Sequence, residues 1–143
     1  MDIRTLNESI SVAPQIQPQD LSAIAAAGFK AVVNNRPDDE EPGQPSGDTI
    51  RAAAEAAGLA YHSVPVGREG IGQGQLDAMT AALVDAGGPV LAFCRSGTRS
   101  CHLWALAAAQ AGRNPHLLQA QAEAAGYDLA PLRPSLDRLA GQA

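Results

Sequence analysis

The sequence predicts an α/β fold: a mainly parallel central sheet of about four or five strands with helices on both faces. Short apolar segments rich in β-branched residues alternate along the chain with longer segments of helical periodicity. Glycine and proline residues separate most of these segments. Aromatic residues make up only 3% of the chain, so the core must consist mainly of Ala, Leu, Val and Ile. This alternation is typical of β-α-β units, whose helices cover both faces of a parallel sheet.

The first half of the chain contains three expected strands with two helices between them. Each strand is a short apolar run that ends in polar or turn residues, as in "ISVAPQI" (10–16), "FKAVVNN" (29–35) and "LAYHSVPV" (59–66). Each helix has capping residues or a proline at its start and a glycine at its end, as in "PQDLSAIAAAG" (18–28) and "DTIRAAAEAAG" (48–58). A proline-rich and acidic loop, "RPDDEEPGQPSG" (36–47), joins the second strand to the second helix.

The second half contains one more expected strand and four helices. The strand "PVLAF" (89–93) is the most apolar of the chain, so we place it near the centre of the sheet. Apolar residues recur at helical spacing in "QLDAMTAALVDAGG" (75–88) and in the segment 100–111. Two further helices are expected over "HLLQAQAEAAG" (116–126) and "LRPSLDRLAG" (132–141), the second interrupted at Pro134.

Length and charge limit the function classes. A chain of 143 residues is long enough for one hydrophobic core, so we expect a single domain over residues 1–143. The net charge of −5 argues against binding of nucleic acid through the overall field of the protein. No basic segment precedes an apolar stretch near the N-terminus, and no run approaches membrane-spanning length. We therefore expect a cytoplasmic protein that binds neither nucleic acid nor membranes.

Cys94 and Cys101 are the only cysteines, too few for a disulfide framework. Their spacing to His62, His102 and His116 matches no zinc-binding pattern, so we expect no metal site. Nothing in the sequence points to another cofactor. Cys101 falls inside an apolar helix and is interpreted as a packing residue, with a role as a second reactive thiol as the less favoured alternative.

The chemistry is expected in the loop "CRSGTRS", residues 94–100, which joins the apolar strand 89–93 to a helix. A strand that feeds a tight loop into a helix leaves backbone N–H groups directed into the loop, where they bind an anion. The thiolate of Cys94 is the first candidate anion. The helix N-terminus and Arg99 are expected to lower the pKa of the Cys94 thiol and make it a nucleophile.

The other loop residues have expected roles around that sulfur. Gly97 allows the backbone to turn without a Cβ, and Arg99 can bind oxyanions in pairs. Ser100 can hydrogen-bond the Cys94 sulfur from the first helical turn. The catalytic residues are therefore predicted to be Cys94, Arg99 and Ser100, and the anion-binding loop is predicted to comprise Arg95, Ser96, Gly97 and Thr98.

Several separated blocks resemble the phosphatase-like domain of the beta-lactamase-hydrolase-like proteins, a small bacterial family. The blocks are "SVAPQI", "AAAGFKAVVNNRPDDEEPGQPS", "YHSVPV" and "FCRSGTRSCHLWALA", which together cover about residues 8–112. The resemblance implies a fold similar to that of dual-specificity phosphatases. It also implies a persulfide-oxidising enzyme as a candidate partner, because the family includes fused members. The last thirty residues carry no motif.

The loop departs from the cysteine-dependent phosphatases in its length. Those enzymes have five residues between cysteine and arginine, whereas this chain has four, as rhodaneses do. A shorter loop offers fewer N–H donors for the three equatorial oxygens of a phosphoryl group. A single sulfur held on Cys94 as a persulfide needs less room. Phe93 also stands where the phosphatases carry a histidine.

A phosphatase also needs an acid that protonates the leaving oxygen. Such general acid catalysis raises the reaction rate by about 10²–10⁴-fold. No aspartate follows the strand 59–66, where these enzymes carry it, and only Glu69 is available there. Asp38 in the acidic segment 38–41 is the second candidate, because its loop also leaves the carboxyl end of a strand. We interpret that segment primarily as a solvated, charge-rich loop, and the adjacent Arg36 as a structural ion-pair partner.

On these residues, sulfur transfer is favoured narrowly over phosphate hydrolysis. In the favoured hypothesis Cys94 takes a sulfur from a small-molecule donor and passes it to a small thiol acceptor, with Arg99 stabilising charge. In the alternative, Cys94 forms a phosphocysteine with a phosphate ester, and Glu69 or Asp38 serves as acid. The third hypothesis is a module without turnover that senses persulfides or binds a partner.

Overall fold

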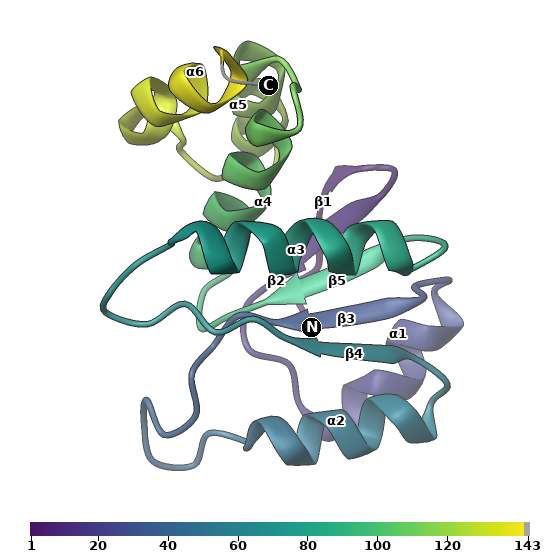
Figure 1. Ribbon diagram of the computed structural model, residues 1–143. Helices are drawn as coiled ribbons and strands as arrows, with labels where there is room; N and C mark the ends of the chain where they lie inside the picture. The colour runs from purple at the N-terminus through teal and green to yellow at the C-terminus, as the bar shows by residue number, and fades with distance from the viewer. Residues whose placement is uncertain (142–143) are drawn as a thin grey trace.

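Five short strands form one sheet in the order β1-β2-β5-β3-β4 (Figure 1). The computed structural model describes residues 1–141. Four neighbouring strands of the sheet run parallel, and β1 pairs antiparallel with β2 at one edge. The strands are β1 (Arg4–Asn7), β2 (Ile10–Ala13), β3 (Ala31–Asn34), β4 (Ala60–Ser63) and β5 (Val90–Phe93).

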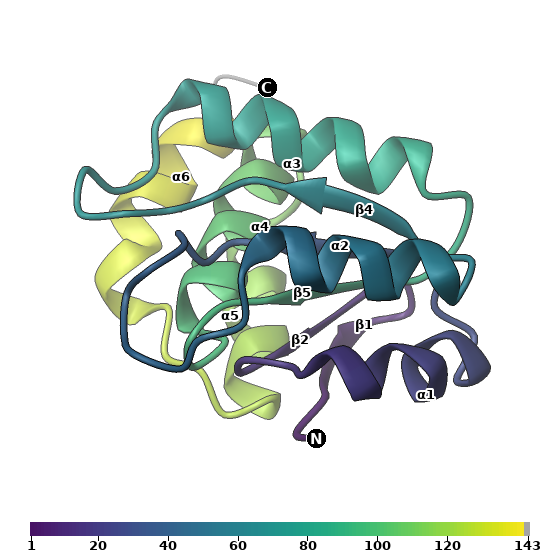
Figure 2. The same cartoon turned by 90° about the horizontal axis from the view of Figure 1, so that it is seen from below.

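Helices cover both faces of this sheet, as the alternating sequence pattern predicts. α1 and α2 lie below the sheet in Figure 1 and come to the front in Figure 2, while α3 lies above the sheet. α4 packs against α3, α5 and α6 on the side of α3. The α-helices are α1 (Leu21–Ala26), α2 (Gly47–Ala56), α3 (Gln73–Asp85), α4 (Thr98–Gln110), α5 (Pro115–Ala124) and α6 (Arg133–Gly141), and the short 3₁₀ turns are η1 (Pro18–Asp20) and η2 (Ala130–Leu132). None of the helices within residues 1–141 is long and apolar enough to cross a bilayer.

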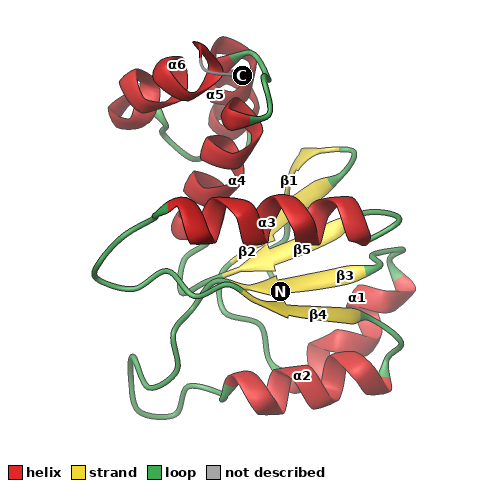
Figure 3. Cartoon of the chain, in the orientation of Figure 1, coloured by secondary structure: helices red, strands yellow, loops and turns green. Residues whose placement is uncertain are grey.

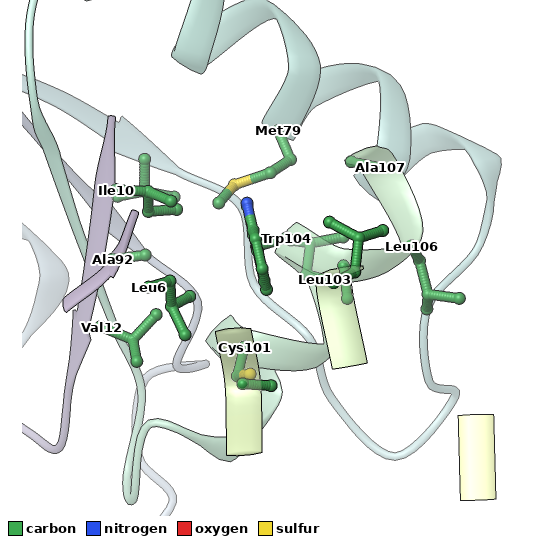
Figure 4. Close-up of a cluster of buried hydrophobic side chains, with 14 of the residues drawn as sticks. Leu6, Ile10, Val12, Met79, Ala92, Cys101, Leu103, Trp104, Leu106 and Ala107 are labelled. Atoms are coloured by element: carbon green, nitrogen blue, oxygen red, sulfur yellow. The ribbon is translucent and has the colours of Figure 1, made fainter. Parts of the chain in front are cut away.

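The sheet separates two apolar clusters. The larger one joins the sheet to α3, α4, α5 and α6, and Figure 4 shows Trp104, Met79 and Cys101 within it. The smaller one lies between the sheet and the pair α1 and α2. All four residues of β2, β3 and β5 are buried, and β5 lies in the middle of the strand order. The expectation of a central β5 is confirmed.

Two elements differ from the sequence-based expectations. The sequence predicts no strand at 4–7, because "RTLN" has a single apolar residue. In the structure this segment forms β1 by pairing with β2 in a tight hairpin. The expected interruption at Pro134 is wrong. Helix α6 starts at Arg133, so Pro134 lies in its first turn, where proline's missing N–H costs no hydrogen bond.

The carboxyl ends of the parallel strands meet at one edge of the sheet, where the functional loop lies. Three of the connections that leave this edge are seen among the green loops of Figure 3. They are the segment 35–46 after β3, the segment 64–72 after β4, and the loop 94–97 between β5 and α4. Ligands in open α/β sheets bind at this edge, so the fold brings the three segments together where a site is expected.

Candidate active site

The loop 94–97 curls around the sulfur of Cys94. The backbone N–H of Gly97 donates a hydrogen bond of 3.1 Å to the Cys94 Sγ. Gly97 has a φ of +90°, and a Cβ at that position would collide with the hydroxyl of Tyr127. Tyr127 donates a hydrogen bond of 3.3 Å to the Ser96 carbonyl. The tight turn therefore requires glycine for its backbone conformation and for the space that Tyr127 occupies.

Cys94 is placed at the predicted edge of the sheet, but its side chain is not at the surface. The residue is 0% exposed, beneath the loop that follows it. Because a nucleophile must reach its substrate, the role predicted for Cys94 from the sequence leads us to expect a sulfur open to solvent at the rim of the sheet, and the structure differs on this point. The sulfur lies at the base of the loop because β5 is the central buried strand and Cys94 directly continues it.

Arg99 is held by two acceptors from other loops. Its Nη1 donates to the Glu40 carboxylate at 2.8 Å and to the Val66 carbonyl at 2.8 Å. Its Nη2 donates to the other Glu40 oxygen at 2.9 Å. Hydrogen bonding to Glu40, together with the nearby Cys94, raises the pKa of the Arg99 guanidinium. Arg99 thus ties the functional loop to the segments after β3 and β4.

These contacts leave one edge of the Arg99 guanidinium open. A guanidinium has five N–H donors, and Glu40 and Val66 use three of them. The two others, the Nε–H and the second Nη2–H, lie on the same edge and donate to no oxygen or nitrogen atom among residues 1–141, while the nearby Cys94 sulfur contributes to the raised pKa of Arg99. Two parallel donors match two oxygens of a phosphoryl or carboxylate group. Arg99 can therefore bind an oxyanion without releasing Glu40.

Backbone N–H groups of the loop are further hydrogen-bond donors beside Arg99. Among the described residues, four N–H groups of the loop and of the first turn of α4 donate to no acceptor, those of Arg95, Ser96, Arg99 and Ser100. They belong to the loop and to the first turn of α4, where intrahelical acceptors are lacking. Backbone N–H groups in such a position bind anions. The shorter loop thus still has several donors around its sulfur.

Glu40 is held from its other side by a buried arginine. The Arg36 side chain is only 2% exposed; its Nε donates to Glu40 at 2.8 Å and its Nη2 to Glu41 at 2.9 Å. Its third contact is the Gln15 side-chain oxygen at 3.0 Å. The expectation that Arg36 is an ion-pair partner is confirmed. Glu41 also lies 3.8 Å from Arg95, whose side chain is mostly exposed.

The segment 38–41 is therefore not simply the solvated loop that its composition predicts. The side chain of Glu40 is 27% exposed and pairs with both Arg99 and Arg36. The Arg99 hydrogen bond, with help from Arg36, lowers the pKa of Glu40 from its usual 4.5 to about 2. Glu40 consequently stays ionised at any pH at which the protein is expected to work.

Ser100 is buried, and its hydroxyl donates to the side-chain oxygen of Asn35 at 2.7 Å. Asn35, also fully buried, donates to the Val64 carbonyl at 2.9 Å. The expected hydrogen bond from Ser100 to the Cys94 sulfur is not the one formed here, so a role of Ser100 toward the sulfur stays a prediction. Asn35 and Ser100 join the ends of β3 and β4 to α4.

The remaining loop residues face outward. Arg95, Ser96 and Thr98 are exposed, and the Ser96 hydroxyl donates to the Thr98 hydroxyl at 3.0 Å. The backbones of Arg95 and Ser96 belong to the loop around Cys94, as expected. Their roles in anion binding remain predictions.

The two acids predicted for a phosphatase, Asp38 and Glu69, line neither of the two recesses that Arg99 lines. The Asp38 carboxylate accepts the Gly47 N–H at 2.8 Å and lines a recess on the far side of Arg36, beside Tyr61. Glu69 lies exposed in a turn and forms no hydrogen bond or ion pair within residues 1–141. The recess beside Arg99, about 450 Å³ in volume, is lined instead by Asp39 and Glu40.

Cys101 lies in the core rather than in the site. It is fully buried in α4, and Figure 4 shows it among the apolar side chains. Burial raises the pKa of its thiol to about 12, and the neighbouring Cys94 contributes. Cys101 therefore stays protonated at neutral pH, which favours its interpretation as a packing residue. Within residues 1–141 no three His, Cys, Asp or Glu side chains gather as metal ligands would.

Sequence reasoning missed three residues of the site: Glu40, Asn35 and Tyr127. Glu40 was hidden in an acidic run that is usually solvated. Asn35 could have been found, because two consecutive polar residues end an otherwise apolar strand at the carboxyl edge. Tyr127 offers no local signal, because it reaches the loop only through the packing of α5 against α4.

Comparisons with known proteins show the family to which this chain belongs. The family model for the beta-lactamase hydrolase-like protein, phosphatase-like domain, matches residues 2–112. The beta-lactamase hydrolase-like protein of Agrobacterium fabrum is 40% identical over 108 residues, which are 76% of this chain and 25% of that relative. The chain thus spans a quarter of this relative's length.

Solved structures give the same picture for the fold. A candidate phosphatase from Neisseria meningitidis Z2491 is 35% identical with a TM-score of 0.83, covering 97% of this chain and 99% of its own. TpbA of P. aeruginosa, in a cysteine-to-serine form bound to phosphotyrosine, has a TM-score of 0.66 at 17% identity, covering 97% and 88% of the two chains. At that identity the likeness is one of fold alone.

Proposed function

The chain belongs to the family of the phosphatase-like domain of beta-lactamase hydrolase-like proteins, and from this premise we propose that it is a cysteine-dependent phosphatase. In this proposal Cys94 is the nucleophile and Arg99 binds the phosphoryl oxygens. The proposal reverses the order of the two hypotheses drawn from the sequence, in which sulfur transfer came first. The reason is that the family and the solved relative are phosphatase-like in description and fold.

The open edge of Arg99 is the observation that carries the proposal. Glu40 and Val66 fix the guanidinium, and its Nε–Nη2 edge keeps two parallel donors for an oxyanion. The unpaired loop N–H groups supply further donors, and the Gly97 N–H already contacts the sulfur. Prearranged donors of this kind stabilise the charge that develops on a transferred phosphoryl group. These donors support phosphoryl transfer despite the short loop.

The reaction takes place in two displacements. The Cys94 thiolate attacks phosphorus, the bond from phosphorus to the ester oxygen breaks, and the leaving oxygen takes a proton. Water then gives a proton to the carboxylate that protonated the leaving oxygen and attacks the phosphocysteine. The sulfur–phosphorus bond breaks, and inorganic phosphate leaves with the thiolate restored. Because Cys94 is 0% exposed, the loop must open from this conformation before the sulfur can reach a substrate.

Asp39 is the carboxyl group best placed to supply the proton. It lines the recess beside Arg99, whereas Asp38 and Glu69 do not. Glu40 lines the same recess, but both of its carboxylate oxygens accept hydrogen bonds from Arg99 and Arg36, so it is held as an ion-pair partner. Asp39 forms no hydrogen bond or ion pair within residues 1–141, and it has a left-handed φ of +62°, a strained conformation that occurs often at functional sites. Glu69 is the alternative acid.

The substrate class is a phosphate monoester. TpbA binds phosphotyrosine, and its likeness to this chain in fold is compatible with an ester of that kind. Three arginines, Arg68, Arg95 and Arg99, line the recess beside the loop against two acids, Asp39 and Glu40, which leaves a modest positive balance for an anionic substrate.

Sulfur transfer is the second candidate function, because one specific observation favours it. Four residues separate Cys94 from Arg99, the loop length found in rhodaneses rather than in the related phosphatases. A persulfide on Cys94 would need only the sulfur-facing N–H groups, and no proton donor.

One experiment distinguishes the candidates. The protein is assayed with p-nitrophenyl phosphate, with and without vanadate, and the same preparation is incubated with thiosulfate or glutathione persulfide before intact-mass measurement. The phosphatase predicts vanadate-sensitive phosphate release that is lost in Cys94→Ser and reduced about 10²-fold or more in Arg99→Lys. Cys101→Ser, the matched cysteine control, should keep the activity. A gain of one sulfur on Cys94 with no phosphate release would replace the proposal with the transferase.

A further inference from the structure

An apolar recess lies beside Arg99, on the side away from the acidic segment. We call it the apolar recess; it has a volume of about 390 Å³ and is bounded by the segment after β4, by α4, and by the start of α6. Its apolar walls are Val66, Ile71, Leu106 and Leu132. Val66 and Leu106 are buried and thereby fixed in the core, while Ile71 and Leu132 are partly exposed and pack against the same core.

Arg99 belongs to the walls of two recesses at once. On one side is the charged recess that Asp39, Glu40 and Arg95 line, and on the other is the apolar recess. The Val66 carbonyl accepts a hydrogen bond of 2.8 Å from Arg99, so the guanidinium is fixed relative to the apolar wall. A molecule whose anionic group binds Arg99 therefore has a charged surface on one side and an apolar surface on the other.

The polar groups of the apolar recess carry no charge other than that of Arg99. His102 lies one helical turn after Arg99, and burial lowers the pKa of its imidazole, which keeps it neutral at neutral pH. Within residues 1–141 its ring forms no hydrogen bond. A neutral, partly buried imidazole can accept or donate one hydrogen bond to a substituent of a ligand, but it does not attract a second charge.

We propose that the apolar recess is the subsite for the leaving group, and that the substrates are phosphate monoesters of phenols or comparably apolar alcohols. This inference rests on the proposed phosphatase function and adds its substrate class. A ring next to the ester oxygen would displace water from four apolar side chains, which favours binding. The hydroxyls of a sugar or polyol would lose water there and find only His102 and Ser135 as partners.

The test compares 2-naphthyl phosphate with glycerol 2-phosphate. In the wild type we expect kcat/KM to be higher for the naphthyl ester by about tenfold or more, the scale on which apolar subsites discriminate. Ile71→Gln and Leu132→Gln place an amide on the partly exposed walls and should reduce this ratio about tenfold. Leu117→Gln makes the same change on an exposed leucine of α5 and should leave both rates unaltered.

Binding of inert phosphonates tests the recess without turnover. The Kd values of 2-naphthylmethylphosphonate and methylphosphonate are measured from the His102 imidazole resonance, assigned with His102→Ala. We expect the naphthyl compound to bind at least about tenfold more tightly, and Ile71→Gln to remove the difference. Equal affinities, or no binding of either compound, would overturn the apolar recess as a subsite. Tight, recess-dependent binding without phosphate release from any ester would instead contradict the proposed phosphatase and leave the subsite in place.

Discussion

Arg99 is the residue on which the proposed site depends, and Glu40 fixes the orientation of its guanidinium. Glu40 takes the Nη1–Nη2 end of Arg99 and is itself held by Arg36, a nearly fully buried arginine. This arrangement turns the other edge of Arg99 into a fixed pair of donors. Removing one member of such a network leaves buried charge without a partner, which costs more than a surface ion pair is worth.

The pH dependence of stability follows from Glu40. Its folded pKa of about 2 lies below the usual 4.5, so its ionised form stabilises the folded state above pH 4.5. That contribution is lost as the pH falls from 4.5 through 2. We expect urea unfolding from pH 7 down to pH 2 to give a lower free energy of unfolding for Glu40→Gln than for the wild type at neutral pH, with the difference shrinking below pH 4.5. A constant difference across this range would contradict the assignment.

Gly97 permits a sharper test, because the chain offers a matched glycine. Gly97 and Gly87 both have a positive φ, +90° and +68°, but only Gly97 has a neighbour that a Cβ would meet. The strained conformation costs each alanine variant about 1–3 kcal/mol. Gly97→Ala should lower the free energy of unfolding, measured by chemical denaturation, more than Gly87→Ala does, because its new Cβ would meet the Tyr127 hydroxyl. Removing the Tyr127 hydroxyl with Tyr127→Phe should recover part of the extra loss; equal losses for the two glycines would refute the steric argument.

At the scale of elements, a buried polar pair joins β3 to α4. Asn35 directly follows β3, and Ser100 lies in the first turn of α4, with 2.7 Å between their side-chain oxygens. Both residues are essentially unexposed. The pair fixes where the first turn of α4 stands relative to the sheet, and therefore where the loop N–H groups and Arg99 lie.

We expect Ser100→Ala to destabilise the protein by about 1–3 kcal/mol, because it leaves the buried Asn35 oxygen without a donor. Asn35→Ala should have a similar effect, and the double variant should lose less than the sum of the two. Ser96→Ala, which removes an exposed serine of the same loop, should change the stability by no more than about 0.5 kcal/mol. Additive losses in the double-mutant cycle would mean that the two residues do not interact.

The elements also indicate how far sequence patterns reach. The apolar runs of β2, β3 and β5 and the periodicity of α3 and α4 were sufficient to place them, because each buries a continuous face. β1 was not predicted, because its pairing with β2 rather than its composition makes it a strand. The interruption at Pro134 was wrongly predicted for a related reason. Proline breaks a helix in its interior but is well tolerated in a first turn, and the start of α6 at Arg133 determines which of these positions Pro134 occupies.

At the scale of the whole molecule, residues beyond the family match belong to the same core. The match ends at residue 112, yet Leu118, Leu129 and Leu136 are buried in the cluster that holds α4. Tyr127, from the same region, contacts the functional loop. The segment after residue 112 thus supports the helix that carries Arg99.

Leu136→Ala tests that support. Leu136 is fully buried in the larger cluster, and such truncations cost about 2–5 kcal/mol. Leu117 is a leucine of the same region with 51% exposure, so Leu117→Ala should cost no more than about 0.5 kcal/mol. Thermal or urea unfolding measures both. A small effect of Leu136→Ala would mean that α6 contributes little to the folded core.

The sequence by itself determined the fold class, the central position of β5 and the loop that carries Cys94 and Arg99. These features are local: hydrophobic periodicity, turn residues and a short motif are contiguous in the chain. Only the tertiary structure decided that the sulfur is buried, that Glu40 rather than Asp38 meets the arginine, and that Tyr127 stands against Gly97. Each of these features depends on contacts between segments that are distant in the chain. Those contacts are set by tertiary packing and not by a local sequence pattern.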